Sequence, residues 1–96
     1  MKVVFHPHAY DEMLESSRYL EVKNSGLGLD LLDAIQEAVR RITKFPESGS
    51  LERANIRKAL VRGFPFTLLY EVRQDHLFIA AVMHQHRKPG YWASRM

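Results

Sequence analysis

Residues 77–83, Leu77-Phe78-Ile79-Ala80-Ala81-Val82-Met83, are apolar at every position. An uninterrupted apolar run of this length predicts a strand that is covered on both faces, as a central strand of a sheet is. Gln74-Asp75 come before the run and predict a tight turn, and residues 66–73 form a second strand candidate before that turn. The two runs together predict an antiparallel hairpin at the centre of one sheet.

A third strand candidate, residues 56–61, precedes this hairpin and differs from it in charge. Arg57, Lys58 and Arg62 interrupt its apolar pattern, so one face of the strand must meet solvent or a charged ligand. Two interpretations are open. The strand is an edge strand whose basic side chains discourage pairing between sheets, or it presents cations to the phosphates of a target.

The N-terminal half predicts a strand over residues 2–5 and two helices, over residues 7–22 and 29–45. Asn24-Ser25-Gly26 breaks the helical pattern, and Pro46 ends the second helix before a polar loop that runs through Ser50. Each helix carries one stripe of mainly apolar side chains at spacings of three and four. The stripes consist of Tyr10, Met13, Leu14, Ser17 and Leu20 in the first helix, and Leu31, Ile35, Ala38, Ile42 and Phe45 in the second.

The order of these elements predicts a single α+β domain over residues 1–96. We expect an N-terminal strand, a two-helix antiparallel hairpin and then a three-stranded antiparallel meander, with the helices packed on one twisted sheet. A chain of 96 residues can build one core, and a second core or a deep cleft is hard to add at this size. A function that uses an exposed platform is therefore favoured over one that needs an enclosed pocket.

Composition and charge narrow the classes of function further. The chain has no cysteine, which excludes disulfides and thiolate chemistry, and its short apolar start is neither a signal peptide nor a membrane span, so we expect a soluble cytoplasmic protein. Residues 1–50 carry six Lys/Arg against eight Asp/Glu, a net charge of −2, whereas residues 51–96 carry eight against three, a net charge of +5. The basic second half is the part to search for an anionic partner.

The sharpest candidates for chemistry are His84, Arg87 and Tyr91, which follow the central strand. RNA cleavage by the neighbouring 2′-hydroxyl needs a proton acceptor, a proton donor and a cation beside the phosphorane, and imidazole, phenol and guanidinium can fill these roles. The alternative is structural: His84 caps the strand, Arg87 packs along its stem, and Tyr91 closes the core together with Trp92.

Several features occur in a characteristic order along nearly the whole chain. They are Pro46-Glu47 after a long helix, the basic strand from Ile56 to Arg62, Phe64-Pro65-Phe66, and the series His-x-x-Arg-x-Pro-x-Tyr-Trp over residues 84–92. This order resembles the RelE/ParE family of bacterial toxins, which belong to type II toxin–antitoxin modules. The last two features look most like the ParE-like branch.

The resemblance implies a toxin that is neutralised by a cognate antitoxin and, in the ParE-like branch, poisons DNA gyrase. The RelE-like branch cleaves messenger RNA on the ribosome, and there Arg57, Lys58, Arg62, Arg87 and Tyr91 would resemble its basic and catalytic residues. A third alternative is a non-toxic family member that only binds the antitoxin. A homodimer and a toxin–antitoxin hetero-oligomer both remain open.

No cofactor and no metal are expected. His6-x-His8 and His84-x-His86 have a spacing that would direct two imidazoles to one side of an extended chain. No Asp or Glu accompanies either pair, and exposed histidines in such positions are common, so the spacing alone does not predict a metal site.

Overall fold

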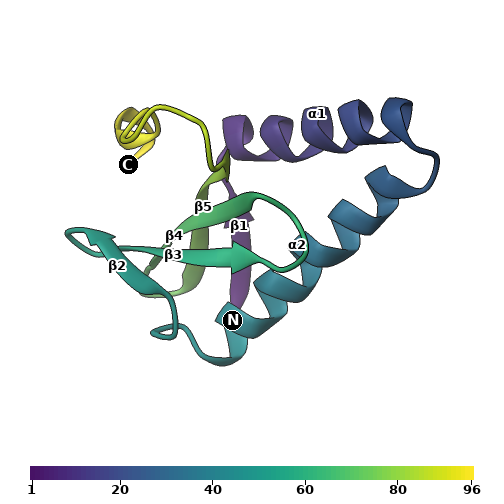
Figure 1. Ribbon diagram of the computed structural model, residues 1–96. Helices are drawn as coiled ribbons and strands as arrows, with labels where there is room; N and C mark the ends of the chain where they lie inside the picture. Colours follow the sequence, from purple (N-terminus) through teal and green to yellow (C-terminus); the bar gives the residue numbers. More distant parts are fainter.

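The computed structural model describes residues 1–96 as two helices, five strands and a short 3-10 turn (Figure 1). The elements are β1 (Lys2–Phe5), α1 (Pro7–Lys23), α2 (Leu27–Lys44), β2 (Ser50–Arg53), β3 (Ile56–Val61), β4 (Phe66–Val72), β5 (His76–His84) and η1 (Ala93–Arg95). The predicted α+β class is confirmed, as are both helices, and the predicted elements occur in the expected order with one further strand, β2, among them. No helix of the structure is both long and apolar enough to cross a membrane.

The five strands form one sheet in the order β1-β5-β4-β3-β2. β1 runs parallel to β5, and the other neighbours are antiparallel. β5 therefore lies between β1 and β4, and its residues from Leu77 to Val82 are buried. This arrangement confirms the prediction that the apolar run over residues 77–83 is a central strand.

At the start of the sheet, one prediction and one of the two open interpretations are wrong. Ser50 does not end a polar loop but begins the strand β2, so the antiparallel meander has four strands, β2 to β5, instead of three. The basic strand β3 is not an edge strand either, because β2 pairs with it from Ser50 to Arg53. All four residues of β2 are exposed, and the strand is held by its backbone pairing with β3.

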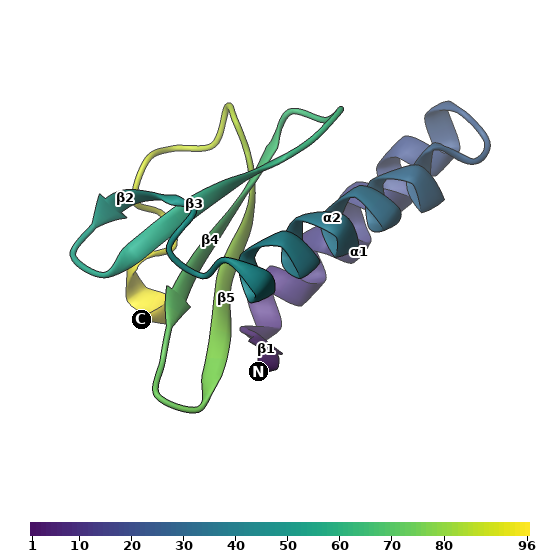
Figure 2. The same cartoon turned by 90° about the horizontal axis from the view of Figure 1, so that it is seen from below.

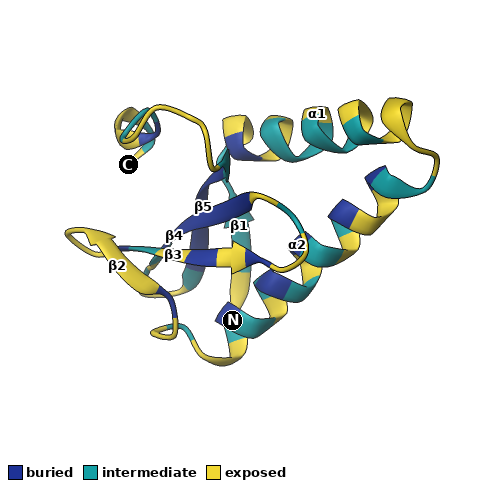
Figure 3. Cartoon of the chain, in the orientation of Figure 1, coloured by how far each residue is buried: buried dark blue, intermediate teal, exposed yellow.

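The two faces of the sheet are covered by different parts of the chain, as Figure 2 shows. The helical hairpin covers one face, where Leu31, Ile35 and Ile42 of α2 meet inward side chains of β3, β4 and β5. The segment after β5 covers part of the other face, where Trp92 is buried against Leu69 and its neighbours. Figure 3 shows the resulting stripe of buried residues along α2 and the central strands.

The turn between the helices is built around glycines and one carboxylate. Gly26 has a φ of 91°, which favours glycine, and both its N–H and that of Gly28 donate to Glu21 of α1, at 2.9 and 3.0 Å. The carboxylate thus neutralises the positive end of α2. A Cβ on Gly28 would lie 2.5 Å from the Ser17 carbonyl oxygen, so the two helices touch backbone to backbone here.

Two side chains of the predicted apolar stripes are exposed. Tyr10 is 49% exposed, and Ala9 is the residue of α1 that is fully buried. Phe45 is 57% exposed because the chain leaves helical geometry at this residue and turns toward β2. The position of α1 over the sheet thus depends on a small side chain that allows close approach, which the spacing of large apolar residues does not reveal.

Candidate functional site

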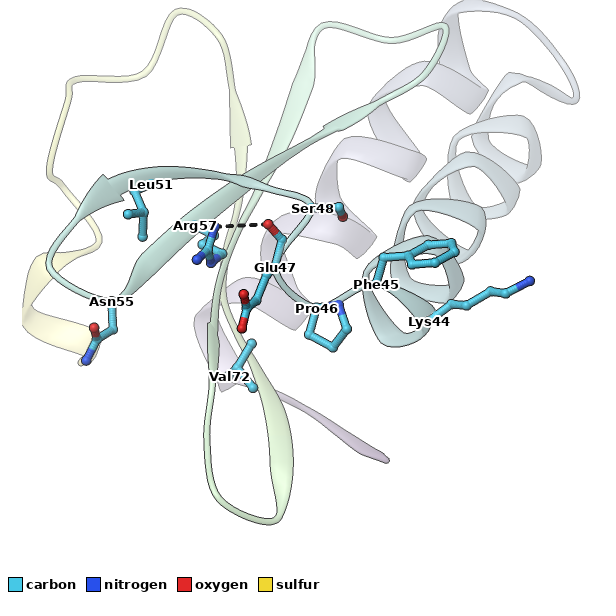
Figure 4. A pocket seen from close by; sticks show the side chains of 9 residues that line it. All are labelled: Lys44, Phe45, Pro46, Glu47, Ser48, Leu51, Asn55, Arg57 and Val72. Atoms are coloured by element: carbon cyan, nitrogen blue, oxygen red, sulfur yellow. Dashed lines mark hydrogen bonds between the residues drawn. The ribbon is translucent and has the colours of Figure 1, made fainter.

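Arg57 of β3 is tied to the loop that joins α2 to β2. Its Nη1 donates to the carbonyl oxygens of Glu47 and Gly49, at 3.0 and 2.7 Å. Arg57 is also one of the residues that line an open groove of about 800 Å³, and Figure 4 shows these residues. Phe45 and Leu51 are among the residues that line the same groove. Arg57 therefore holds the loop in place as well as facing this groove.

The same loop is held by Tyr70 of β4, which sequence reasoning did not single out. The buried Tyr70 hydroxyl accepts the Gly49 N–H at 3.0 Å and donates to the Pro46 carbonyl oxygen at 2.7 Å. A Cβ on Gly49 would lie 2.5 Å from that hydroxyl and 2.7 Å from the Lys58 carbonyl oxygen, so only glycine fits without a shift. These contacts hold the loop between α2 and β2 in one conformation.

Lys58 and Arg62 lie apart from Arg57, in a second groove on the other side of this loop. The Lys58 Nζ is 3.5 Å from Glu52, and the Arg62 Nη1 is 3.7 Å from Glu37. Both cations are well exposed, so these ion pairs are weak. The structure thus divides the predicted phosphate-contact residues between two neighbouring grooves, and their contact with a target stays a prediction.

The structure also separates the three C-terminal candidates, His84, Arg87 and Tyr91. The Arg87 guanidinium lies 3.9 Å from the centre of the Tyr91 ring, and Tyr91 packs on the sheet face that carries Trp92. His84 lies against Phe66, at 5.2 Å between ring centres, in an apolar groove beside α1 on the face that the helices cover. Arg87 and Tyr91 are brought together, and His84 is on the opposite face from them.

Tyr91 is engaged in a partly buried polar cluster that sequence reasoning missed. Its hydroxyl donates to Glu12 Oε2 at 2.8 Å. Glu12 also accepts from the Arg95 guanidinium at 3.0 and 2.9 Å, and from the Val82 N–H at 3.0 Å. Arg95 in turn donates to the Ala80 carbonyl oxygen at 3.0 Å. The cluster links α1, β5 and the C-terminal segment.

The position of this cluster follows from the short length of β1. Pairing between β1 and β5 ends at Ile79, and the His6 N–H donates to the Ile79 carbonyl oxygen. Beyond that point β5 has no neighbouring strand on this side, and its backbone groups need other partners. The Glu12 carboxylate and the Arg95 guanidinium supply those partners at Val82 and Ala80.

The surroundings of Tyr91 make its phenol a weaker acid than an ordinary tyrosine. Burial, and after it the Glu12 carboxylate that accepts its hydroxyl hydrogen, raise the pKa of the phenol well above its ordinary value of 10.0. At neutral pH the hydroxyl is therefore protonated and committed to Glu12.

The raised pKa of Tyr91 predicts a loss of stability in alkali. A phenol with a higher pKa in the folded state contributes stability that is complete below about pH 10 and is lost as the pH rises toward the folded pKa. We expect urea denaturation to show a fall in the free energy of unfolding from pH 9 to pH 11 that is smaller in Tyr91→Phe. Equal falls in both proteins would contradict this assignment.

The histidine pairs do not gather further ligands. The rings of His6 and His8 are 5.2 Å apart, and those of His84 and His86 are 5.1 Å apart. The His6 Nδ1 accepts the His8 N–H, and the His84 Nδ1 accepts the His86 N–H. No group of three or more His, Cys, Asp or Glu side chains has the geometry of a metal site.

Comparison with known proteins places the chain in a family. A family model described as "ParE toxin of type II toxin-antitoxin system, parDE" matches residues 3–89. Among solved structures, a chain from "Chromosomal ParDE TA system from P. aeruginosa" matches with a TM-score of 0.76 and 16% identity over 88% of this chain and 95% of that chain. No curated protein sequence matches. The structural match agrees with the fold, and the family model spans most of the sequence: the chain belongs to the ParE toxin family of type II toxin–antitoxin systems.

Proposed function

We propose that this chain is neutralised by a cognate antitoxin and, when free, inhibits growth in the cytoplasm by poisoning DNA gyrase. Membership of the ParE toxin family supports the toxin role. The Phe64-Pro65-Phe66 motif and the C-terminal series ending in Tyr91-Trp92 favour the ParE-like branch.

The observation that carries the choice of mechanism is the placement of His84 and Tyr91. A ribonuclease that uses the 2′-hydroxyl needs an acid and a base within reach of one phosphate. Here the His84 imidazole packs against Phe66 on the helix-covered face. The Tyr91 ring packs on the other face, and its hydroxyl donates its hydrogen to Glu12 beside β5. This arrangement favours a toxin that acts by binding its target over one that acts by proton transfer.

The test is induced expression of the chain in bacteria, with DNA breaks and messenger-RNA integrity measured in parallel. Gyrase poisoning predicts double-strand breaks, filamentous cells and intact messages, all suppressed when the antitoxin is co-expressed. Purified chain added to gyrase and plasmid DNA should likewise inhibit supercoiling or accumulate cleaved DNA.

Tyr91→Phe separates the two mechanisms within this test. If the phenol only supports the fold, the variant retains its effect on gyrase at temperatures where it is folded. If the phenol is an acid in RNA cleavage, cutting falls by a factor on the order of 10² or more. Cut messages with intact DNA would overturn the proposal, and normal growth on induction would favour the non-toxic alternative.

A further inference from the structure

Two arginines from distant parts of the chain stack on adjacent aromatic rings of the C-terminal segment, residues 85–96. The Arg87 guanidinium lies 3.9 Å from the centre of the Tyr91 ring, and the Arg53 guanidinium, at the end of β2, lies 5.3 Å from the centre of the Trp92 ring. Figure 2 shows the end of the chain returning to the hairpin of β2 and β3. Trp92 is buried and Tyr91 is partly buried, so the two rings give the guanidiniums fixed supports.

The backbone of this segment also makes room for Arg53. Gly90 has a φ of 78°, in the left-handed region that favours glycine, and a Cβ there would lie 2.9 Å from the Arg53 Nη2. Ala54, the residue after Arg53, has a φ of 49°, which is uncommon for a residue with a Cβ. Both left-handed residues thus lie where Arg53 meets the C-terminal segment. The Trp92 ring and the Gly90 backbone together place its guanidinium.

The two guanidiniums have no counter-charge within the chain. None of the ion pairs of the structure involves Arg53, Arg87 or the neighbouring Lys88. Glu52, the residue before Arg53, pairs with Lys58 instead, at 3.5 Å. All three free cations are exposed. This part of the surface therefore offers positive charge to a partner.

The same surface lacks apolar side chains for a peptide to cover. The exposed large apolar residues of the chain include none between Gln85 and Arg95. An amphipathic segment binds through apolar anchors, which are missing here. Guanidiniums that stack on aromatic rings and have no carboxylate partner suit phosphate groups, which they bind through two parallel N–H donors. A nucleic-acid backbone, with its series of phosphates, fits this surface better than an acidic peptide does.

We propose that Arg53 and Arg87, with Lys88 beside them, bind the phosphate backbone of duplex DNA. Neither arginine lines the two grooves described above, so this is a separate surface. The inference rests on the proposed function in taking the DNA that gyrase holds as the duplex. Contacts to gyrase and to DNA at once favour the complex in which the two are joined. Phosphate contacts carry no base information, so the contact is independent of DNA sequence.

Direct binding tests the contact without gyrase. The probe is a labelled DNA duplex, followed by fluorescence anisotropy over a range of salt concentrations. Arg53→Gln combined with Arg87→Gln should weaken binding about tenfold or more at low salt and reduce the salt slope by about two, one for each lost phosphate contact. The control is Arg18→Gln combined with Arg40→Gln, which removes the same charge from exposed positions of the helices. It should change the affinity by less than about threefold. Equal binding by wild type and the first variant overturns the inference.

Lysine at both positions separates charge from support of the fold. Arg53→Lys combined with Arg87→Lys retains both charges and removes the planar groups that stack on the rings. If the arginines contact phosphates, this variant keeps a salt slope close to that of wild type. If it binds the duplex as weakly as the glutamine variant and melts at a lower temperature than wild type, the arginines only hold the C-terminal segment, and the inference is overturned.

The gyrase assay keeps failure of the inference apart from failure of the proposed function. The glutamine variant should need about tenfold more protein than wild type to accumulate the same amount of cleaved plasmid. Equal cleavage by both overturns the DNA contact and leaves gyrase as the target. Wild-type chain that binds the duplex through these arginines but leaves gyrase unaffected overturns the proposed function alone. A glutamine variant that loses affinity for the antitoxin and keeps it for the duplex shows that the surface receives a protein, which also overturns the inference.

Discussion

Replacement of Arg95 with alanine is expected to lower the free energy of unfolding by about 3 kcal/mol or more, because it leaves the largely buried Glu12 carboxylate without its cation. The Arg95 side chain is 10% exposed and donates to both oxygens of Glu12, whose side chain is 14% exposed. The substitution also removes the donor to the Ala80 carbonyl oxygen. For a domain of this size, the melting temperature should fall by more than about 12 °C, which a thermal scan followed by circular dichroism would measure.

A double variant provides the control for this prediction. In Glu12→Gln combined with Arg95→Met, no charge is left buried, and the side-chain amide that replaces the carboxylate can still accept the Val82 N–H. The double variant should therefore lose less stability than Arg95→Ala, although it changes two residues of the cluster. A melting temperature of Arg95→Ala within a few degrees of wild type would show that the pair does not fasten the C-terminal segment.

The elements that the sequence predicts well are those with a local pattern. The two helices carry apolar stripes at helical spacing, and residues 77–83 of β5 are all apolar. Each pattern therefore predicts the type of element and the face that it buries. β2 has no such pattern, because all four of its residues are exposed. The loop before β2 is held by Tyr70 of β4, whose hydroxyl bonds to Gly49 and Pro46 in that loop.

The sheet order also depends on contacts that are distant in sequence. β1 pairs with β5 and not with the strand that follows it along the chain, and no turn connects the two. The same holds for Glu12 and Arg95, which lie 83 residues apart. A single acidic residue in a helix and an arginine near the end of the sequence carry no local sign that they meet.

The candidate site was predictable to the extent that its residues are neighbours in sequence. Arg87 and Tyr91 are four positions apart in the segment after β5, and they stack on each other. His84 is close to both in sequence but is the last residue of β5, and side-chain alternation directs it to the helix-covered face. Arg57 was predicted as a basic residue of the site, but its hydrogen bonds to the loop carbonyl oxygens could not be predicted from the sequence.

Ile79→Ala is expected to lower the free energy of unfolding by about 2–5 kcal/mol, since it removes a fully buried side chain and leaves a cavity. Ile79 pairs with Phe5 of β1 and with Tyr70 of β4, where the two halves of the sheet meet under the helices. The neighbouring residues cannot move far enough to fill the cavity, because strand pairing fixes their backbone on both sides.

Matched variants make the Ile79 prediction specific to its position. Ile79→Val removes one methylene and should cost about 0.5–1.5 kcal/mol. Val72→Ala, at the exposed end of β4, should change stability by less than about 0.5 kcal/mol. Urea denaturation of the three proteins checks this order.

Because a domain commonly has only about 5–15 kcal/mol of stability in total, Ile79→Ala should also reduce toxicity by depleting the folded chain. An unchanged urea midpoint for Ile79→Ala would mean that the packing around the central strand is not what holds this fold together.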